Sequence, residues 1–421
     1  MKSTFSMSLF KVLFLAIAAI DIQRTSSIGS SFLPQVVLSI SLLIVLFFLK
    51  PLYFNSNENS VSLLYVKLFL IWNIICIARG LFVAENYWEW KHLLLGSLVL
   101  LMPLFVYVFT NKSFVQHILI FWLKFSLPLI VIFVPIVNNP SFYGIYLSPI
   151  MFFLLLFPLL PLKWKIIVLA LTLFAFIEST GSRSIMIRLS ISTLLGMMYY
   201  FRVFLEEWIF KTIHIVLLFL PIVLLLLGLL NIFNVFKINQ YIKGDYQLMS
   251  SETGKAKKTS LKADTRTFIY RENINSALKH NYVIQGRTPA NGYDSKYFGN
   301  FLKFVLHTGK LQRFTSEVGI LNIFTWGGLI SVVLYFLVFF QATFLALYRS
   351  NNYFIKIIGL FVSFRWAYSF VEEITSFNIL YIFLWLFIAM CYSEEFRKMS
   401  DMEIALWVKG IFNKKQINTR K

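Results

Sequence analysis

The sequence predicts an all-α, polytopic integral membrane protein. Hydrophobic residues make up 58% of its 421 residues and charged residues only 14%, and the mean hydropathy of +0.73 lies far above the range of soluble globular proteins. Apolar runs long enough to cross a bilayer as helices recur along the sequence, whereas the alternating segments of about ten residues that are typical of membrane β-barrels do not occur. We expect about twelve transmembrane helices.

Nine of the expected spans precede one long polar segment, and three follow it. The first apolar run, Met7 to Ile20, resembles a signal peptide. A retained helix is the preferred interpretation, because it makes the later loop charges consistent. Two spans carry prolines that predict kinked or broken helices, namely Pro128, Pro135, Pro149, Pro158 and Pro161. The other spans are expected at 33–49, 62–82, 92–110, 116–138, 141–161, 165–180, 184–201, 212–233, 318–348, 354–370 and 374–393.

Basic residues concentrate in alternate short loops, and this bias predicts the orientation of the chain. One set of loops contains Lys50, Lys112 and the basic tail after Arg397, while the other set is poorer in Lys and Arg. Because cytoplasmic loops are enriched in these residues, both termini should be cytoplasmic. The regions are then nine spans in 1–233, a large periplasmic or extracellular loop with short helices in 234–317, three spans in 318–393 and a basic cytoplasmic tail in 394–421.

The large loop has a composition that attracts phosphate groups. Between Val235 and Glu317, fourteen Lys or Arg residues stand against six Asp or Glu residues, in a chain of formal charge +20. These basic residues gather in the loop and at span ends and do not form a folded basic domain, so we expect lipid phosphates or pyrophosphates as partners and no nucleic acid. Cys76 and Cys391 lie in apolar spans without ligand spacing, so neither a disulfide nor a thiolate metal site is indicated.

The first candidate binding residue is Arg183, in the segment ESTGSRSIMIR. An arginine at a membrane boundary is often only an anchor whose head reaches the interface. Here Gly181 and Ser182 precede it at the expected start of a helix, where free N–H groups and the helix dipole favour an anion. Both interpretations remain open for this segment on its own.

Three more arginines lie in the loop itself. The stretch from Thr267 to Lys279 has helical spacing and follows Arg266, and it is followed by the turn-forming segment GRTPANGYD. This turn is either a solvated loop or part of a binding site. Arg266, Arg271 and Arg287 offer planar donor groups that match phosphate oxygens better than lysine does.

Two residues near the end of the loop are candidate bases. His307 and Glu317 occur in FVLHTGKLQRFTSEVGILNIFTWGGLI, just before a glycine-containing span. A lone histidine is more often structural, but an imidazole at the membrane end of an arginine-rich loop can accept a proton near neutral pH. Glu317 is a competing base or an ion-pair partner.

Taken in order, these motifs resemble the O-antigen polymerase and O-antigen ligase family. The marks are TGSRS at a span start, TRTFIYRENINSAL and QGRTPANGY in the loop, and HTGKLQRFTSEVGILNIFTWGGLI leading into a span. The resemblance implies a membrane glycosyltransferase in the bacterial inner membrane. Such an enzyme takes glycan from a polyprenyl-pyrophosphate carrier on the outer leaflet, with neither a metal nor another cofactor. It acts in lipopolysaccharide or capsule biosynthesis, with chain-length regulator or flippase proteins as partners.

The resemblance also assigns roles to residues. Arg183, Arg266 and Arg287 match the positions of family arginines, and His307 matches the histidine before the following span. With no paired carboxylates for Mg²⁺ in an outer loop, arginines are suited to stabilise the diphosphate leaving group. We expect Arg183, Arg266, Arg287 and Arg271 to bind pyrophosphate while His307 or Glu317 accepts a proton, with inversion at the anomeric carbon.

The sequence is compatible with three functions. A polymerase that joins repeat units is favoured over a ligase that transfers glycan to lipid A–core, because the family's His-Asn pair is His307-Thr308 here. A transporter or flippase for lipid-linked sugars is a third reading. It is disfavoured because a transporter would carry more ionisable residues in mid-span than Lys124 and Arg365.

Overall fold

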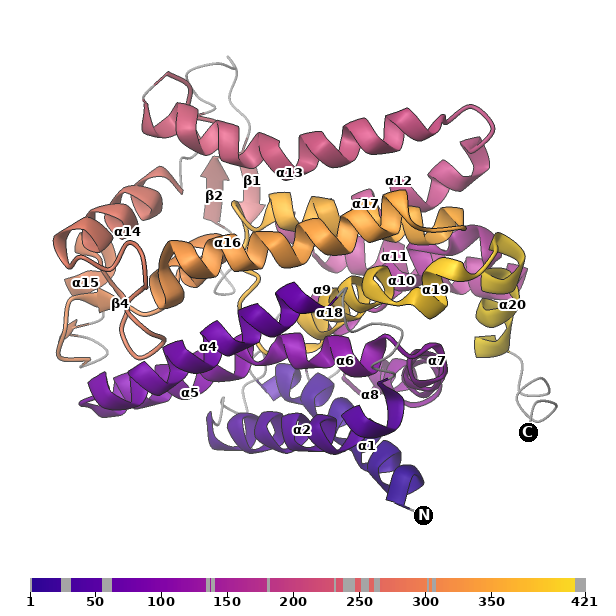
Figure 1. Ribbon diagram of the computed structural model, residues 1–421, viewed down its shortest axis with the longest axis horizontal. Helices are drawn as coiled ribbons and strands as arrows, with labels where there is room; N and C mark the ends of the chain where they lie inside the picture. Colours follow the sequence, from indigo (N-terminus) through magenta and orange to yellow (C-terminus); the bar gives the residue numbers. More distant parts are fainter. Residues whose placement is uncertain are drawn as a thin grey trace.

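The computed structural model confirms a predominantly helical protein with very little strand (Figure 1). Seven helices in the described part of the chain are long and apolar enough to cross a membrane, and two shorter apolar helices, at 5–19 and 379–392, accompany them. The structure describes residues 2–23, 32–54, 63–133, 137, 141–179, 182–230, 232–237, 247–250, 257–260, 266–300, 303–304 and 308–412.

The helices before the polar segment follow one another with short connections. They are α1 (Lys2–Gln23), α2 (Phe32–Tyr53), α4 (Leu64–Val83), α5 (Tyr87–Leu100), η1 (Met102–Leu104), α6 (Phe105–Phe109), α7 (Lys112–Phe121), η2 (Trp122–Ser126), α8 (Leu127–Phe133), α9 (Ser141–Tyr146), α10 (Ile150–Leu155), η3 (Phe157–Leu159), α11 (Leu162–Glu178), α12 (Arg183–Met197), η4 (Met198–Phe201) and α13 (Glu207–Leu229).

The remainder contains the polar segment and the last helices. Its elements are β1 (Gln247–Ser250), β2 (Lys257–Ser260), α14 (Thr267–Lys279), β3 (Tyr293–Asp294), α15 (Lys296–Asn300), β4 (Gln312–Arg313), α16 (Gly319–Tyr348), α17 (Tyr353–Tyr368), α18 (Ile379–Tyr392), α19 (Glu394–Lys398) and α20 (Asp401–Phe412). Strand β1 pairs antiparallel with β2, and β3 pairs antiparallel with β4.

Several sequence predictions can be compared with these elements directly. The helix predicted from Thr267 to Lys279 is confirmed as α14 with the same bounds. The broken helices predicted from the prolines of the expected span at 141–161 are confirmed. This stretch is a series of short helices, and Pro149 and Pro158 lie at their interruptions, as proline's missing N–H and steric clash require. Pro135 lies outside the described residues. The number of twelve spans stays a prediction, since seven helices among the described residues are long and apolar enough to cross a membrane.

Helix α18 forms the centre of the bundle. All of its residues are buried, and it packs against α6, α16 and α17. A helix that is apolar on every face is stable in this position because no side of it has to face water. Its first turn is capped by Asn378, whose side chain accepts a hydrogen bond from the N–H of Tyr381 at 3.2 Å.

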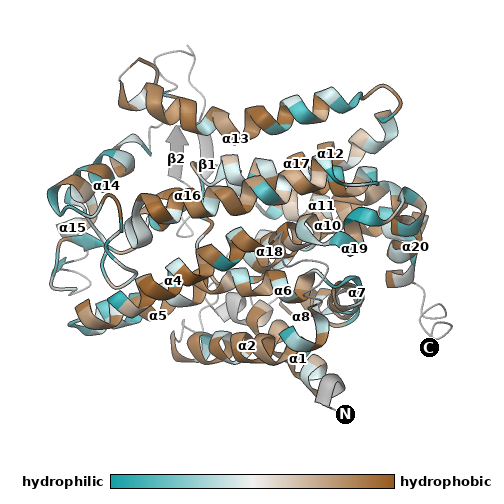
Figure 2. Cartoon of the chain, viewed as in Figure 1, coloured by the Kyte–Doolittle hydropathy of each residue, from teal (hydrophilic) through white to brown (hydrophobic). Residues whose placement is uncertain are grey.

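The two ends of the bundle differ in their connections. At one end, α14, α15 and the β3–β4 pair lie beside the tip of the α4–α5 hairpin, and much of α14, α15 and their loops is hydrophilic (Figures 1 and 2). Lys310 joins these parts through ion pairs with Glu85 at 3.2 Å and Glu89 at 2.6 Å. At the other end, α19 and α20 pack near α7, where Trp407 Nε1 donates to the carbonyl of Lys112 at 3.1 Å.

Helix α16 is interrupted near its first third by Gly328, whose φ is 69°. The loop segment that follows α14 fills the break with its own backbone. The N–H groups of Arg287 and Thr288 donate to the carbonyls of Thr325 and Trp326, at 2.7 and 3.1 Å. The N–H groups at 329 and 330 donate to the carbonyls at 283 and 284, at 2.9 and 3.2 Å. The helix break therefore fixes the loop to the membrane helix without leaving those backbone groups unpaired.

Candidate anion-binding site

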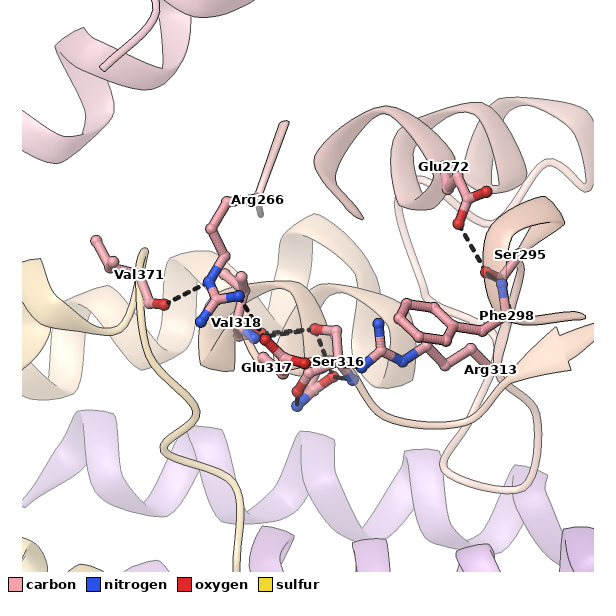
Figure 3. A network of polar contacts seen from close by, with 10 residues as sticks. Arg266, Glu272, Ser295, Phe298, Arg313, Ser316, Glu317, Val318 and Val371 are labelled. Atoms are coloured by element: carbon pink, nitrogen blue, oxygen red, sulfur yellow. Dashed lines mark hydrogen bonds and ion pairs between the residues drawn. The ribbon is translucent and has the colours of Figure 1, made fainter. Parts of the chain in front are cut away.

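The core of the candidate site is an arginine held between a glutamate and a backbone carbonyl. Arg266, just before α14, forms an ion pair with Glu317, and its Nε donates to the carbonyl of Val371 at 3.1 Å (Figure 3). The other oxygen of Glu317 lies 3.5 Å from Nη2 of Arg313 on β4. Arg313 also lies over the ring of Phe298, 4.2 Å from its centre. One carboxylate thus orients two guanidinium groups from distant segments.

A second carboxylate lies one residue beyond Val371. Glu372 forms an ion pair with Arg188 of α12 and a longer one, 3.4 Å, with Arg365 of α17. The side chains of Arg188 and Arg365 are 3% and 2% exposed, and that of Glu372 is 14% exposed. Charges this deeply buried are costly unless paired, so this cluster is a strong functional candidate.

These six side chains carry an excess of positive charge. Four arginines (Arg188, Arg266, Arg313 and Arg365) and two glutamates (Glu317 and Glu372) give a formal charge of +2, which the neighbouring Glu373 reduces to +1. Within the described part of the chain, Nη2 of Arg365 and Nη1 of Arg313 are buried without a hydrogen-bond partner. Unused donors of this kind, near fixed positive charge, suit an anionic group.

The backbone that carries Glu317 is held by a polar network around Asn322. Its Oδ1 accepts from the N–H of Ser316 at 2.7 Å, and its Nδ2 donates to the hydroxyl of Thr375 at 2.7 Å. The N–H of Gly319, at the start of α16, donates to the carbonyl of Glu372 at 2.9 Å. The segments that carry Glu317 and Glu372 are therefore hydrogen-bonded to each other, which fixes the relative positions of the arginines that these carboxylates bind.

An apolar groove adjoins the arginines. It has a volume of about 400 Å³ and is formed by α13, α14 and the end of α17, with Leu224, Ile274 and Phe370 among its walls. Val371, which binds Arg266, lines it as well. Helix α13 offers this face because few of its residues are buried against the rest of the described protein.

The mouth of the groove is basic. Arg271 and Lys237 line the groove and also line a neighbouring pocket of about 510 Å³, where Lys279 and Lys296 add charge beside Glu272 and Asp294. The carboxylate of Glu272 accepts from the hydroxyl of Ser295 at 2.7 Å (Figure 3). It also accepts from the N–H groups of 296 and 297 at the start of α15, so its oxygens already have partners. The groove and the pocket together fit a molecule with an apolar chain and an anionic head.

The structure brings together only part of the residue set predicted from the sequence. Arg266 and Glu317 meet directly, and Arg271 stands on the same helix at the mouth of the groove. Arg183 is exposed in the first turn of α12, while Arg188, just over one turn later, is the residue that reaches Glu372. Of the two readings of Glu317, the ion-pair partner is the one that the geometry displays.

Two predicted residues stand apart from this centre. Arg287 binds the carbonyl of Gly292 at 3.0 Å and Asp294 at 3.2 Å, so its observed partners differ from those of Arg266. His307 lies outside the described residues. Thr308 and Lys310, which follow His307, are described, and Lys310 is tied to Glu89 at the tip of the α4–α5 hairpin.

Sequence reasoning missed Arg188, Arg313, Glu372 and the site role of Arg365. Arg365 had one visible signal, since it is a charge inside an apolar span, which marks a functional position. Arg188 carried a weaker form of the same signal. Nothing in the spacing joins it to Glu372, which is 184 residues away.

No group of three His, Cys, Asp or Glu side chains that could hold a metal ion occurs among the residues that the structure describes. In comparisons with known proteins, no family model, no curated protein and no solved structure matches this chain.

Proposed function

We propose that this protein is a membrane glycosyltransferase that joins oligosaccharide repeat units carried on polyprenyl pyrophosphate, at the outer face of a bacterial inner membrane. In this proposal both termini are cytoplasmic, and the end of the bundle with α14 and α15 faces outward. The ordered motifs around Arg183, Arg266 and Arg287 supply the family resemblance, and the site supplies the physical support.

The single observation that carries the proposal is the contact between groove and arginines at Val371. This residue lines the apolar groove, and its carbonyl binds Arg266. A polyprenyl chain is a long hydrocarbon, and its pyrophosphate carries several negative charges. A groove of about 400 Å³ that leads to a cluster of arginines matches both ends of such a molecule.

The proposed reaction is a substitution at the anomeric carbon of the donor sugar. A hydroxyl oxygen of the acceptor sugar attacks the anomeric carbon of the donor, and the bond from that carbon to the pyrophosphate oxygen breaks. The pyrophosphate leaves with the bonding electrons, and its growing negative charge is stabilised by arginine donors. The proton of the attacking hydroxyl passes to His307 in this scheme.

Each arginine has a distinct place in the proposal. Arg266, just before α14, and Arg271 on α14 bind the pyrophosphate, and Arg183 binds it as well on the strength of the family resemblance. Arg313 adds positive charge beside Glu317. Glu317 acts as a positioning residue that keeps Arg266 and Arg313 aligned. Arg287 enters from the segment fixed in the break of α16 and contacts the glycan part of a substrate.

The alternative within the same chemistry is a ligase that moves finished glycan to lipid A–core, and both activities would use the same groove and arginines. A transporter is a weaker alternative. The buried charges Arg188, Arg365 and Glu372 are gathered at one end of the bundle and are bound to one another, whereas a transport path would need ionisable groups along its length.

The test is a gel of surface glycan and of lipid-linked intermediates from cells that lack the gene. The cells are complemented with the wild type, with Arg266→Ala, or with the control Arg202→Ala, which alters an exposed arginine at the turn before α13. We expect the wild type and the control to restore the full ladder and Arg266→Ala to fail, with all three proteins present at equal levels.

The pattern of the failure separates the alternatives. Core that carries a single repeat unit identifies a polymerase. Long polymer that stays on the lipid carrier identifies a ligase. A normal ladder in cells without the gene contradicts both enzymatic proposals, and repeat units trapped on the inner leaflet would indicate a transporter.

A further inference from the structure

A separate pocket lies on the same end of the bundle, between the end of α4 and the segment that follows α14. Its volume is about 440 Å³, and its walls include Arg79 and Phe82 of α4 together with His280, Gln285 and Arg287. None of these residues lines the apolar groove described above. The pocket therefore offers a second binding position on one molecule.

The charge of this pocket is positive. Arg79, Arg287 and His280 line it, and no Asp or Glu is among the described residues of its wall. Asp294 stands behind the wall and binds Arg287 at 3.2 Å and His280 at 2.8 Å. It also binds Lys279 at 2.8 Å, so one carboxylate is shared by up to three cations. The remaining positive charge favours an anionic group in the pocket.

The guanidinium group of Arg79 is held in place by two hydrogen bonds to the loop. Its Nη1 donates to the carbonyl of Gln285 at 2.7 Å, and its Nη2 donates to the carbonyl of Gly286 at 3.1 Å. These two bonds hold the guanidinium plane against the loop. A third contact joins it to the thiol of Cys76, and a guanidinium with five N–H groups keeps donors for a ligand beyond these three. A guanidinium that is fixed in advance loses less conformational entropy when it binds an anion.

The loop that forms the pocket contains three residues with a positive φ, and this conformation is unfavourable for Thr288. Asn281, Gly286 and Thr288 have φ values of 53°, 70° and 73°, and a β-branched residue such as Thr rarely adopts a positive φ. The hydrogen bonds to the break in α16 maintain this shape. Strain that a rigid scaffold maintains in this way is typical of ligand-binding segments.

One buried hydroxyl also points to a ligand. Thr288 lines the pocket, and the residue is 2% exposed. Its Oγ1 has no hydrogen-bond partner in the part of the chain that the structure describes. Buried hydroxyl groups are normally paired, so a ligand atom that enters the pocket would satisfy it.

The other side chains match a saccharide. The amides of Asn281, Gln285 and Asn291 line the pocket and can both donate to and accept from sugar hydroxyls. Phe82 stands at the rim with 90% of its surface exposed. An exposed aromatic ring beside amides and arginines gives a sugar ring an apolar surface and its substituents polar partners.

From these observations we propose that the pocket between α4 and the 280–291 segment binds an anionic saccharide, through a carboxylate or a phosphate group that the sugar carries. Arg79 and Arg287 bind the anionic group, and the amides bind hydroxyls. That the saccharide belongs to a growing glycan rests on the proposed function, whereas the anion-binding chemistry of the pocket does not.

The test uses the purified full-length protein in lipid nanodiscs and measures binding of soluble probes by calorimetry. The probes are a uronic-acid trisaccharide, the neutral trisaccharide of the same sugars, a sugar phosphate and inorganic phosphate. We expect both anionic sugars to bind at least about tenfold more tightly than the neutral sugar, as one or two charge-assisted hydrogen bonds predict. A preference for one of them identifies the source of the charge. Equal affinity for all three sugars, or inorganic phosphate binding as tightly as the anionic sugars, overturns the proposal.

Variants locate the binding. Arg79→Gln and Asn291→Ala should each weaken binding of the preferred sugar about tenfold, while Arg202→Gln at the far end leaves it unchanged. Because Arg79 also holds the loop, Phe82→Ala serves as the variant of an exposed side chain that does not affect folding, and its affinity should fall as well. Unchanged affinity in both Asn291→Ala and Phe82→Ala overturns the assignment.

The binding measurement and the glycan gel can give opposite results, so the two proposals are tested separately. One outcome supports the pocket and contradicts the enzyme. In it, the purified protein binds the saccharide in a way that depends on Asn291, while cells that lack the gene show a normal ladder. A ladder that needs Arg266, together with a purified protein that binds no anionic sugar, supports the enzyme and contradicts the pocket.

Discussion

Arg188 on α12 and Glu372 in the connection between α17 and α18 form a buried ion pair, although 184 residues separate them in sequence. The same carboxylate meets Arg365 from α17. Glu372 therefore joins three segments at the end of the bundle where Arg266 and Glu317 lie. The carbonyl of the adjacent Val371 accepts from Arg266, so the position of Arg266 depends on that of Glu372.

Replacement of Glu372 by Ala should destabilise the protein strongly. Two arginines that are 3% and 2% exposed would lose their countercharge, and breaking a buried pair costs about 3–5 kcal/mol. Thermal unfolding in detergent should show a clearly lower midpoint. The control is Glu207→Ala, which removes an exposed glutamate that binds Lys356 at 2.7 Å and should cost less than about 1 kcal/mol. Equal shifts in the two variants would contradict a structural role for the buried cluster.

Replacement of Arg266 separates charge from geometry. Arg266→Ala should lower glycan transfer by about 10²–10³-fold, the size of effect seen when a donor to a developing negative charge is removed. Arg266→Lys keeps the charge but replaces the planar group, whose Nε and Nη1 bind Val371 and Glu317 from two positions, by a single ammonium, so an intermediate loss is expected. Transfer to a lipid-linked acceptor by the purified protein measures both. Full activity in Arg266→Ala would exclude this residue from the site.

Filling the apolar groove should impair use of a lipid-linked donor while the fold is kept. A Cβ added at Gly228 would meet only the carbonyl oxygen of Phe233, at 3.7 Å, so Gly228→Phe places a ring in the groove without a backbone clash. We expect at least about tenfold weaker use of the donor and an unchanged unfolding midpoint. Leu173→Phe, in a different apolar depression between α11 and α12, is the matched control. Equal activity of the two variants would mean that the groove does not bind the lipid chain.

Two glycines with similar backbone angles should respond differently to alanine. Gly286 has φ 70°, and a Cβ there would lie 2.4 Å from the backbone nitrogen of Gly327. Gly309 has φ 77° with open space around it. Gly309→Ala should therefore cost only the positive-φ penalty of about 1–2 kcal/mol, whereas Gly286→Ala should also separate the loop from the break in α16.

Hydrogen exchange followed by mass spectrometry checks this difference. Peptides that cover 281–290 should exchange faster in Gly286→Ala and remain protected in Gly309→Ala. Protection of that segment in both variants would show that the loop does not depend on its close approach to α16.

The cluster around Asp294 should make stability depend on pH in the acidic range. Burial raises the pKa of Asp294, but hydrogen bonds from Lys279, His280 and Arg287 outweigh it and lower the pKa to about 2. Since the pKa is lower in the folded state, the stabilisation is complete above the unfolded value of about 3.9 and is lost as the pH falls towards 2. Because the side chain is 30% exposed, solvent screening limits the contribution to about 1 kcal/mol.

The variant Asp294→Asn tests the sign. Its unfolding midpoint should lie below that of the wild type at pH 7, and the gap should narrow between pH 4 and pH 3. Glu206→Gln, which alters an exposed carboxylate at the start of α13, should show no such convergence. A gap that widens on acidification would assign the stabilisation to another group.

The sequence by itself determined the helical membrane class and the main basic segment. Long apolar runs are unfavourable in water, and in hydrocarbon the backbone has to form its hydrogen bonds internally, as a helix does. Composition and run length were therefore sufficient to predict this class. Helix α14 was predicted to the residue, because the spacing of Ile269, Ile274 and Leu278 and the turn after it are local signals. Arg266 and Arg271 were predicted because arginine matches phosphate oxygens better than lysine does, and Glu317 because it lies just before a span.

Only the tertiary structure decided which charges meet. Arg188 and Glu372 pair because α12 packs against α17, and no local pattern encodes that contact. Arg287 was expected beside Arg266 but binds Asp294. The reason is that the backbone on both sides of Gly286 is hydrogen-bonded to α16 at its break near Gly328. Hydrophobic periodicity gives each helix its buried face, whereas the pairing of distant side chains follows from packing between helices, which the order of residues along one helix does not contain.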